Sequence, residues 1–184
     1  MTRFFWLALV FVATRNHAWT PVLHLPDASL AMFFLAGLWS RSYLPLLGLL
    51  ALGAAVDAWA VGMNGVSAYC ITPAYAMLLP ASATLWWAGR LSGSFALKQG
   101  IAWLPTTGVV TLAALLSELW SSGGFYFLGG RFPHPSLAGF LPRLWHYSPS
   151  VVGATLCYVV LGLLIERRFG FLHDQALAVP LSSR

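Results

Sequence analysis

The apolar run YLPLLGLLALGAAVDAWAVG, from Tyr43 to Gly62, is long enough to cross the hydrocarbon core of a bilayer and contains one charged residue, Asp57. A transmembrane helix needs about 20 predominantly apolar residues. A charge at that depth is costly, and acids within membrane spans usually have a functional role. The run therefore predicts both a membrane span and, at Asp57, a candidate site.

The whole chain has the composition of an integral membrane protein. Of its 184 residues, 59% are hydrophobic and 8% are charged, and the mean hydropathy is +0.75. A soluble domain of this size cannot bury so much apolar surface. The apolar runs are continuous rather than alternating, which favours helices over a β-barrel. The net charge of +5 comes from basic residues scattered singly at segment ends, which argues against nucleic-acid binding.

We expect an all-α membrane protein with six transmembrane helices in a single domain, residues 1–184. The expected spans run from Phe4 to Ala18, Ala28 to Trp39, Tyr43 to Gly62, Val66 to Trp87, Gly100 to Ser121 and Ser148 to Ile165. The first two are short, so they must tilt, thin the bilayer or be sheltered by neighbours. The first is interpreted as a retained span because no clean cleavage site follows it. Residues from about 167 form a short cytoplasmic tail.

Basic residues predict the orientation. Seven of them fall on the inner side and three on the outer side if the N- and C-termini are both cytoplasmic. The outer connections are then residues 17–27, 63–65 and 122–146. Most reactive side chains gather at this face, which predicts a pocket open to the outside. These side chains are His17, His24, Asp27, Asp57, Cys70, Glu118, His134 and His146.

The most informative group is Asp57, Cys70 and Tyr75. Cys70 and Tyr75 lie in the stretch VSAYCITPAY (residues 66–75), and Pro73 breaks the helix between them, which lets both side chains face one cavity. A soft thiol, a carboxylate and a phenol near a helix end indicate a ligand site. The less specific alternative is that Cys70 is a small buried hydrophobic residue.

Three further residues are weaker candidates for the same pocket. Tyr69 could contact a ligand or could equally lie in the interfacial aromatic belt. Histidines such as His17 and His24 are more often interface-facing loop residues than ligands. Cys157 lies in a different apolar segment from Cys70, so a structural disulfide between them is not expected.

The chain resembles the BtuM-type cobalamin transporters. The resemblance rests on LPDASLAMFFLAG (residues 25–37), then Asp57, then YCITPAY (residues 69–75). These are small bacterial inner-membrane proteins related in fold to the substrate-binding S-components of energy-coupling factor (ECF) vitamin transporters. The resemblance implies that the Cys70 thiolate is an axial ligand of the corrinoid cobalt, with Asp57 and Tyr75 in the surrounding pocket. It also implies a pocket histidine, which is either His17 or His24.

The implied function is cobalamin binding and uptake. A strongly donating thiolate should also weaken the bond on the opposite face of the cobalt, so that bound cyanocobalamin loses cyanide. S-components that dock on a shared ECF module commonly carry two alanines four residues apart in the first span. Here Ala8 and Ala13 are one residue too far apart, which favours a solitary transporter over one that uses an ECF module.

Three other kinds of protein remain open from the residues alone. In an intramembrane cysteine enzyme, Cys70 would be the nucleophile, a histidine of the first outer connection the base, and Asp57 the residue that orients it. A tryptophan-rich tetrapyrrole-binding protein, or an S-component for another vitamin, would not need the cysteine.

Overall fold

The computed structural model describes residues 2–15, 25–96 and 103–169, and these are helical apart from short connections. The α-helices are α1 (Thr2–Arg15), α3 (Ser29–Trp39), α4 (Leu44–Met63), α5 (Leu78–Ala96), α6 (Trp103–Leu128) and α7 (Leu137–Phe169), with 3-10 helices η1 (Ala68–Cys70) and η2 (Pro73–Met77) before α5. The expected all-α class is confirmed for these residues.

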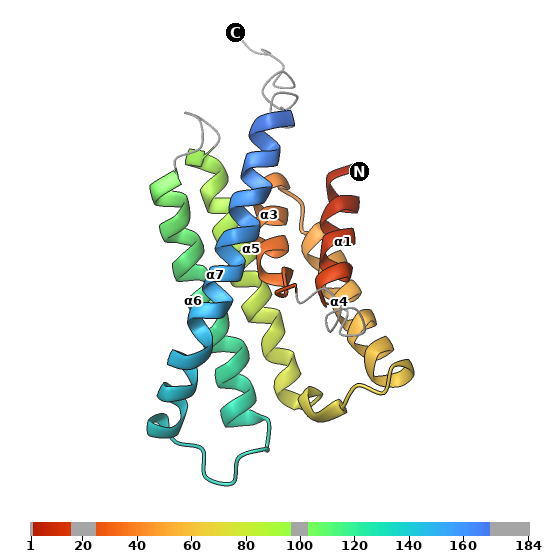
Figure 1. The fold of residues 1–184 in the computed structure, drawn as a ribbon, viewed down its shortest axis with the longest axis vertical. Coiled ribbons are helices and arrows are strands. Elements are labelled where there is room, and N and C mark those ends of the chain that lie inside the picture. The colour runs from red at the N-terminus through yellow and green to blue at the C-terminus, as the bar shows by residue number, and fades with distance from the viewer. Residues whose placement is uncertain (1, 16–24, 97–102, 170–184) are drawn as a thin grey trace.

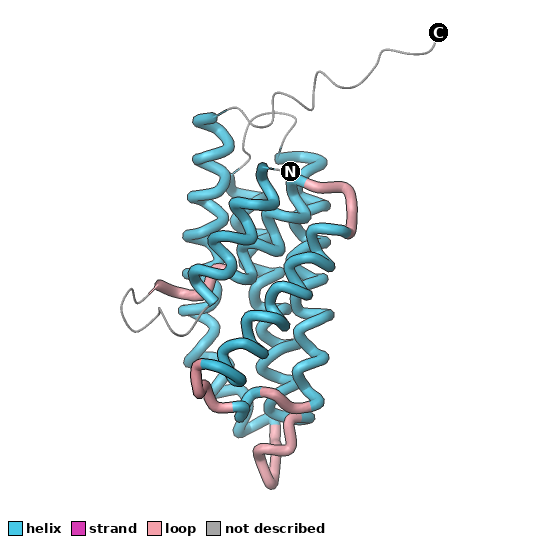
Figure 2. Tube along the Cα trace, turned by 90° about the vertical axis from the view of Figure 1, so that its right-hand side faces the viewer, coloured by secondary structure: helices cyan, strands magenta, loops and turns pink. Residues whose placement is uncertain are grey.

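The helices run alternately up and down in one bundle (Figure 1). The start of α1 and the end of α7 lie at one end, here called the termini end. The connection from α6 to α7 and both 3-10 helices lie at the opposite end, here called the loop end (Figures 1 and 2).

Helix α3 is the centre of the bundle. Nine of its 11 residues are buried, and it packs against α1, α4, α5 and α7. Its sequence, SLAMFFLAGLW, is apolar on every side, which is typical of a helix surrounded by other helices. The largest fully buried side chains of the core include Phe34 of α3, Phe11 of α1 and Trp86 of α5.

Two glycines allow α3 and α5 to approach closely. A Cβ atom added at Gly37 of α3 would lie 1.9 Å from the carbonyl oxygen of Trp86, and one added at Gly89 of α5 would lie 1.9 Å from the carbonyl oxygen of Phe34. Both obstacles are backbone atoms, so no side-chain rotation could relieve the overlap. Small residues at such crossings are typical of helix pairs in membranes, where close packing replaces the hydrophobic driving force.

Unequal helix lengths leave space at the loop end. Helices α1 and α3 have 14 and 11 residues, whereas α6 and α7 have 26 and 33. At 1.5 Å per residue, α3 is about 16 Å long and α6 about 39 Å. The end of α1 and the start of α3 therefore lie near mid-height of the bundle, while the longer helices continue past them (Figure 1).

The outer surface of the bundle is strongly apolar. Helix α4 and the segment Leu137–Arg168 of α7 are long and apolar enough to cross a membrane, by length and composition. Only 22% of the most apolar 18-residue stretch of each helix is buried, whereas the core helix of a soluble protein would be mostly buried. Large apolar side chains such as Leu104 and Trp145, both 84% exposed, lie on the outside.

The expected span boundaries were accurate for α3 and α4, and wrong at the start of α5, at the end of α6 and at the start of α7. Helix α1 begins two residues earlier than expected, and the expected boundaries at Ala18 and Gly100 lie outside the described residues. Helices α3 and α4 begin and end within one residue of expectation. The expected span from Val66 to Trp87 is wrong in its first part, because the α-helix begins only at Leu78. Pro73 has no N–H and forces the residue before it into an extended conformation, and Thr72 has φ −132° and ψ 171°.

The last two helices are longer at the loop end than expected. Helix α6 continues beyond Ser121 to Leu128, and α7 begins at Leu137 rather than at Ser148 and contains Pro142 and Pro149. Much of the expected outer loop, residues 122–146, is therefore helical. Gly123 and Gly124 have low helix propensity, but tertiary packing overrides it. For example, a Cβ atom at Gly124 would lie 2.4 Å from Cγ of Met77 in η2.

Candidate functional site

A network of charged and polar side chains lies where α1 ends. The guanidinium of Arg15 donates from Nε to Oδ1 of Asp57 (2.8 Å) and from Nη2 to Oδ2 of Asp57 (2.6 Å), a side-on bidentate pair. The hydroxyl of Tyr75 donates to Oδ2 of the same carboxylate at 2.6 Å. Arg15 also donates from Nη1 to Oγ of Ser29 (3.2 Å), and Oδ2 of Asp27 lies 3.8 Å from Nη1.

The pair at the centre of this network is largely withdrawn from solvent. The side chains of Arg15 and Asp57 are 18% and 19% exposed. Asp27 is more exposed, and it accepts hydrogen bonds from both the N–H and the hydroxyl of Ser29. The carboxylate of Asp57 therefore has a fixed orientation and a fixed counter-ion, which are the properties of a preorganised polar group in an apolar protein.

Local backbone features bring these residues together. Gly65 has φ +65° and ends α4 in a reversal in which the N–H of Val66 bonds the carbonyl of Ala60 at 3.1 Å. Residues 66–77 then cross the loop end of the bundle from α4 to α5 as loop and 3-10 helix (Figure 1). Because Pro73 starts η2, Tyr75 lies one turn before α5, opposite Asp57 of α4.

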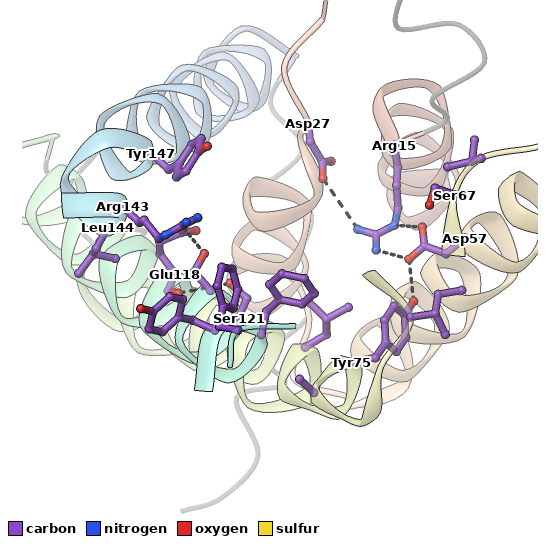
Figure 3. Close-up of a pocket in the computed structure, with 18 of the residues that line it drawn as sticks. Arg15, Asp27, Asp57, Ser67, Tyr75, Glu118, Ser121, Arg143, Leu144 and Tyr147 are labelled. Carbon is purple, nitrogen blue, oxygen red and sulfur yellow. Dashed lines mark hydrogen bonds and ion pairs between the residues drawn. The ribbon is translucent and has the colours of Figure 1, made fainter. Parts of the chain in front are cut away.

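A cavity of about 540 Å³ lies between this network and the α6–α7 side of the bundle. It is not enclosed, and its walls include residues of the loop end such as Ser67 and Phe132. Figure 3 shows Arg15, Asp57 and Tyr75 on one side, with Glu118 and Arg143 on the other. An adjoining cavity of about 500 Å³ shares part of this lining. The lining residues common to both are Arg15, Asp27, Tyr75, Leu78, Glu118 and Ser121.

The structure brings together two of the expected site residues, Asp57 and Tyr75, in a direct hydrogen bond. Tyr69 lies apart from them, with its ring 5.8 Å from that of Phe125 and the guanidinium of Arg131 4.7 Å above it. Cys70 ends η1, but its side chain lies outside the described part of the structure. His17 and His24 both fall outside the described residues.

Arg15 is the main site residue that the sequence analysis missed. We counted it as one of three basic residues on the outer side, whereas its side chain is paired with Asp57 inside the bundle. One signal could have identified it. A carboxylate inside an apolar segment needs a cation, and Arg15 ends the first apolar segment at the face where Asp57 was expected.

No protein-family model matches the chain, and a search of the curated proteins gives no match. Among the described residues, no group of three or more histidine, cysteine, aspartate or glutamate side chains is arranged to hold a metal ion. The described site is an open cavity with a preorganised carboxylate, a phenol and a guanidinium on one wall and aromatic side chains on the other. It fits an organic solute with several polar groups better than it fits a bare ion.

Proposed function

We propose that this chain is a multi-pass protein of the bacterial inner membrane, with both termini in the cytoplasm and the loop end facing outward. The apolar outer surface supports this proposal, because a soluble protein rarely exposes large continuous apolar patches. The shared location of the start of α1 and the end of α7 supports it as well. The cavity then opens to the outside, where a nutrient would be captured.

The proposed ligand is cobalamin, bound in the cavity and carried inward. The observation that carries the proposal is the Arg15–Asp57–Tyr75 network on the wall of an open cavity, with Tyr75 five residues after Cys70 in the 3-10 segment that precedes α5. Two close sequence neighbours of this cysteine, Ser67 and Ile71, line the cavity. The cavity volume lies in the range of about 300–1,000 Å³ that is usual for ligand pockets, and the adjoining cavity extends it.

The chemistry of these residues suits a corrinoid. A thiolate is a soft, strongly donating ligand for a transition metal, so Cys70 would bind the cobalt of the transported molecule. The rings of Phe125, Tyr126 and Phe132 line the cavity and would cover the apolar surface of the macrocycle. Asp57 and Tyr75 would orient the polar groups at its edge.

The test is the absorption spectrum of the purified protein after incubation with cobalamin and washing. Bound corrinoid with bands shifted from those of free cobalamin is expected, at sub-micromolar affinity, since one metal–sulfur bond adds to a large buried ring. Cys70→Ala should lose the shifted bands. Cys157→Ala is the matched control and should keep them, because Cys157 lies exposed on α7. A protein that stays colourless would refute the proposal.

Uptake measurements in cells separate the roles of the other residues. Asp57→Asn and Tyr75→Phe should each weaken uptake less than Cys70→Ala, because each removes hydrogen bonds worth about 1–3 kcal/mol rather than the bond to the metal. Normal uptake by Cys70→Ala, together with loss of uptake in either of the other variants, would show that these roles are wrongly assigned.

A further inference from the structure

One face of α6 turns polar side chains toward the cavity. Glu118, Ser121 and Ser122 line it, followed one turn later by Phe125. The spacing of three and four residues places them on a single side of the helix. Glu118 is only 6% exposed and lines both cavities, so this acid is buried in the protein yet borders the space that a ligand would occupy.

Among the residues that the structure describes, Glu118 has no counter-ion such as Arg15 provides for Asp57. Its Oε1 accepts a hydrogen bond from the hydroxyl of Ser122 at 2.5 Å. The ion pairs found among the described residues involve Asp27, Asp57 and Glu166, and none includes Glu118. A buried carboxylate gains from further N–H or O–H donors, and a ligand in the cavity could supply them because Glu118 lines that cavity.

Arg143 of α7 is a cation that lines the same cavity and has no carboxylate partner among the described residues. Its guanidinium lies 4.8 Å from the ring centre of Phe132 and 5.7 Å from that of Tyr126, and it lines the larger cavity. Within the described part of the chain, no carboxylate lies within ion-pair distance of it. Arginine stacked on aromatic rings keeps its in-plane N–H groups free to donate. Figure 3 shows Arg143 and Glu118 on the same side of the cavity, facing the Arg15–Asp57 pair.

We propose that Glu118, Ser122 and Arg143 form a second subsite, which binds an uncharged primary carboxamide of the ligand. A carboxamide has two N–H donors, which suit the carboxylate of Glu118, and a carbonyl acceptor, which suits the guanidinium of Arg143. A ligand carboxylate would be repelled by Glu118, and an ammonium group by Arg143. The inference rests on the proposed function, because the corrin ring carries several such amides at its edge.

The consequence is selectivity for intact amides at one edge of the ring. The probes are cobalamin and a set of derivatives in each of which one peripheral carboxamide is hydrolysed to a carboxylate. Wild-type protein should bind at least one derivative about tenfold more weakly than cobalamin, because like charges brought together at a desolvated contact cost affinity. Glu118→Gln should recover most of that loss for the same derivative, while Glu166→Gln, at the termini end, should not.

Arg143→Gln provides a second test, in which the substituted residue is not buried and misfolding is therefore not expected. Arg143 is exposed, so the variant should fold, and it should bind cobalamin about tenfold more weakly and the hydrolysed derivative weaker still. If wild type binds cobalamin but Glu118→Gln and Arg143→Gln discriminate among the derivatives as wild type does, the subsite is refuted and the proposed function stands. If wild type binds no cobalamin at all, the proposed function fails and this inference fails with it.

Discussion

Removing the guanidinium of Arg15 should destabilise the protein more than removing that of Arg143, the other arginine in the cavity lining that the structure describes. Arg15→Gln leaves the carboxylate of Asp57 in an apolar site with two charge-assisted hydrogen bonds lost. Such bonds are worth about 1.5–3 kcal/mol each, and breaking a buried pair by removing one partner costs about 3–5 kcal/mol. Both side chains keep nearly a fifth of their exposure, so the lower figure, about 3 kcal/mol, is the better expectation.

The assay is thermal unfolding of the purified protein in detergent. For a chain of this size, about 1 kcal/mol corresponds to about 2–4 °C, so Arg15→Gln should lower Tm by about 6–12 °C. Arg143→Gln is the matched control and should change Tm little, because no carboxylate is paired with it among the described residues. The double variant Arg15→Gln/Asp57→Asn should be more stable than the sum of the single effects predicts. Additive effects, or equal Tm values for the two arginine variants, would refute the reasoning.

Two further predictions concern the bundle and the ligand. Gly37→Ala should lower Tm by more than 5 °C or prevent folding, because a Cβ atom there would lie 1.9 Å from a carbonyl oxygen. Gly153→Ala is the control and should be neutral, because a Cβ atom there meets nothing within 4 Å. Equal effects of the two substitutions would contradict the close packing of α3 and α5. Bound cyanocobalamin should lose its cyanide over minutes to hours in wild type and in Cys157→Ser but not in Cys70→Ser. The corrinoid absorption bands measure this loss. An unchanged cyanide-bound spectrum in wild type, with binding established, would remove the reason for treating Cys70 as a cobalt ligand.

The sequence predicted the fold best where apolar runs end at charged or turn-forming residues. Helices α3 and α4 meet this condition, and their ends agree with expectation within one residue. It failed where long-range packing decides the structure. The fifth span was expected to end at Ser121, yet α6 continues through Gly123 and Gly124 to Leu128. Met77 of η2 packs closely against Gly124. The last span was expected to begin at Ser148, yet α7 begins at Leu137 and continues through Pro142 and Pro149.

The candidate site was predictable only where residue types and local chain breaks determine it. Asp57 and Tyr75 were expected in one pocket from their residue types and from the break at Pro73, and the structure joins them by a hydrogen bond. The pairing of Arg15 with Asp57 was not predicted, because it joins residues 42 positions apart and depends on where the short helix α1 ends. Glu118 was expected near the outer face, but Ser121 and Ser122, which line the cavity beside it, were not predicted as site residues, because the fifth span was expected to end at Ser121.

The shortness of α3 has an electrical consequence under the proposed topology. If water fills the cavity to mid-height, it carries the outside potential to the level of Arg15 and Asp27, and the transmembrane voltage then falls mainly across the remaining barrier. That barrier is about as thick as α3 is long, about 16 Å, and the field within it is correspondingly steeper than in the surrounding bilayer. No residue of α3 carries a charge on which this field could act. Among the described residues, Arg15, Asp27 and Asp57 carry charges at this level of the cavity, so under the proposed topology the membrane voltage would act on this network rather than on α3.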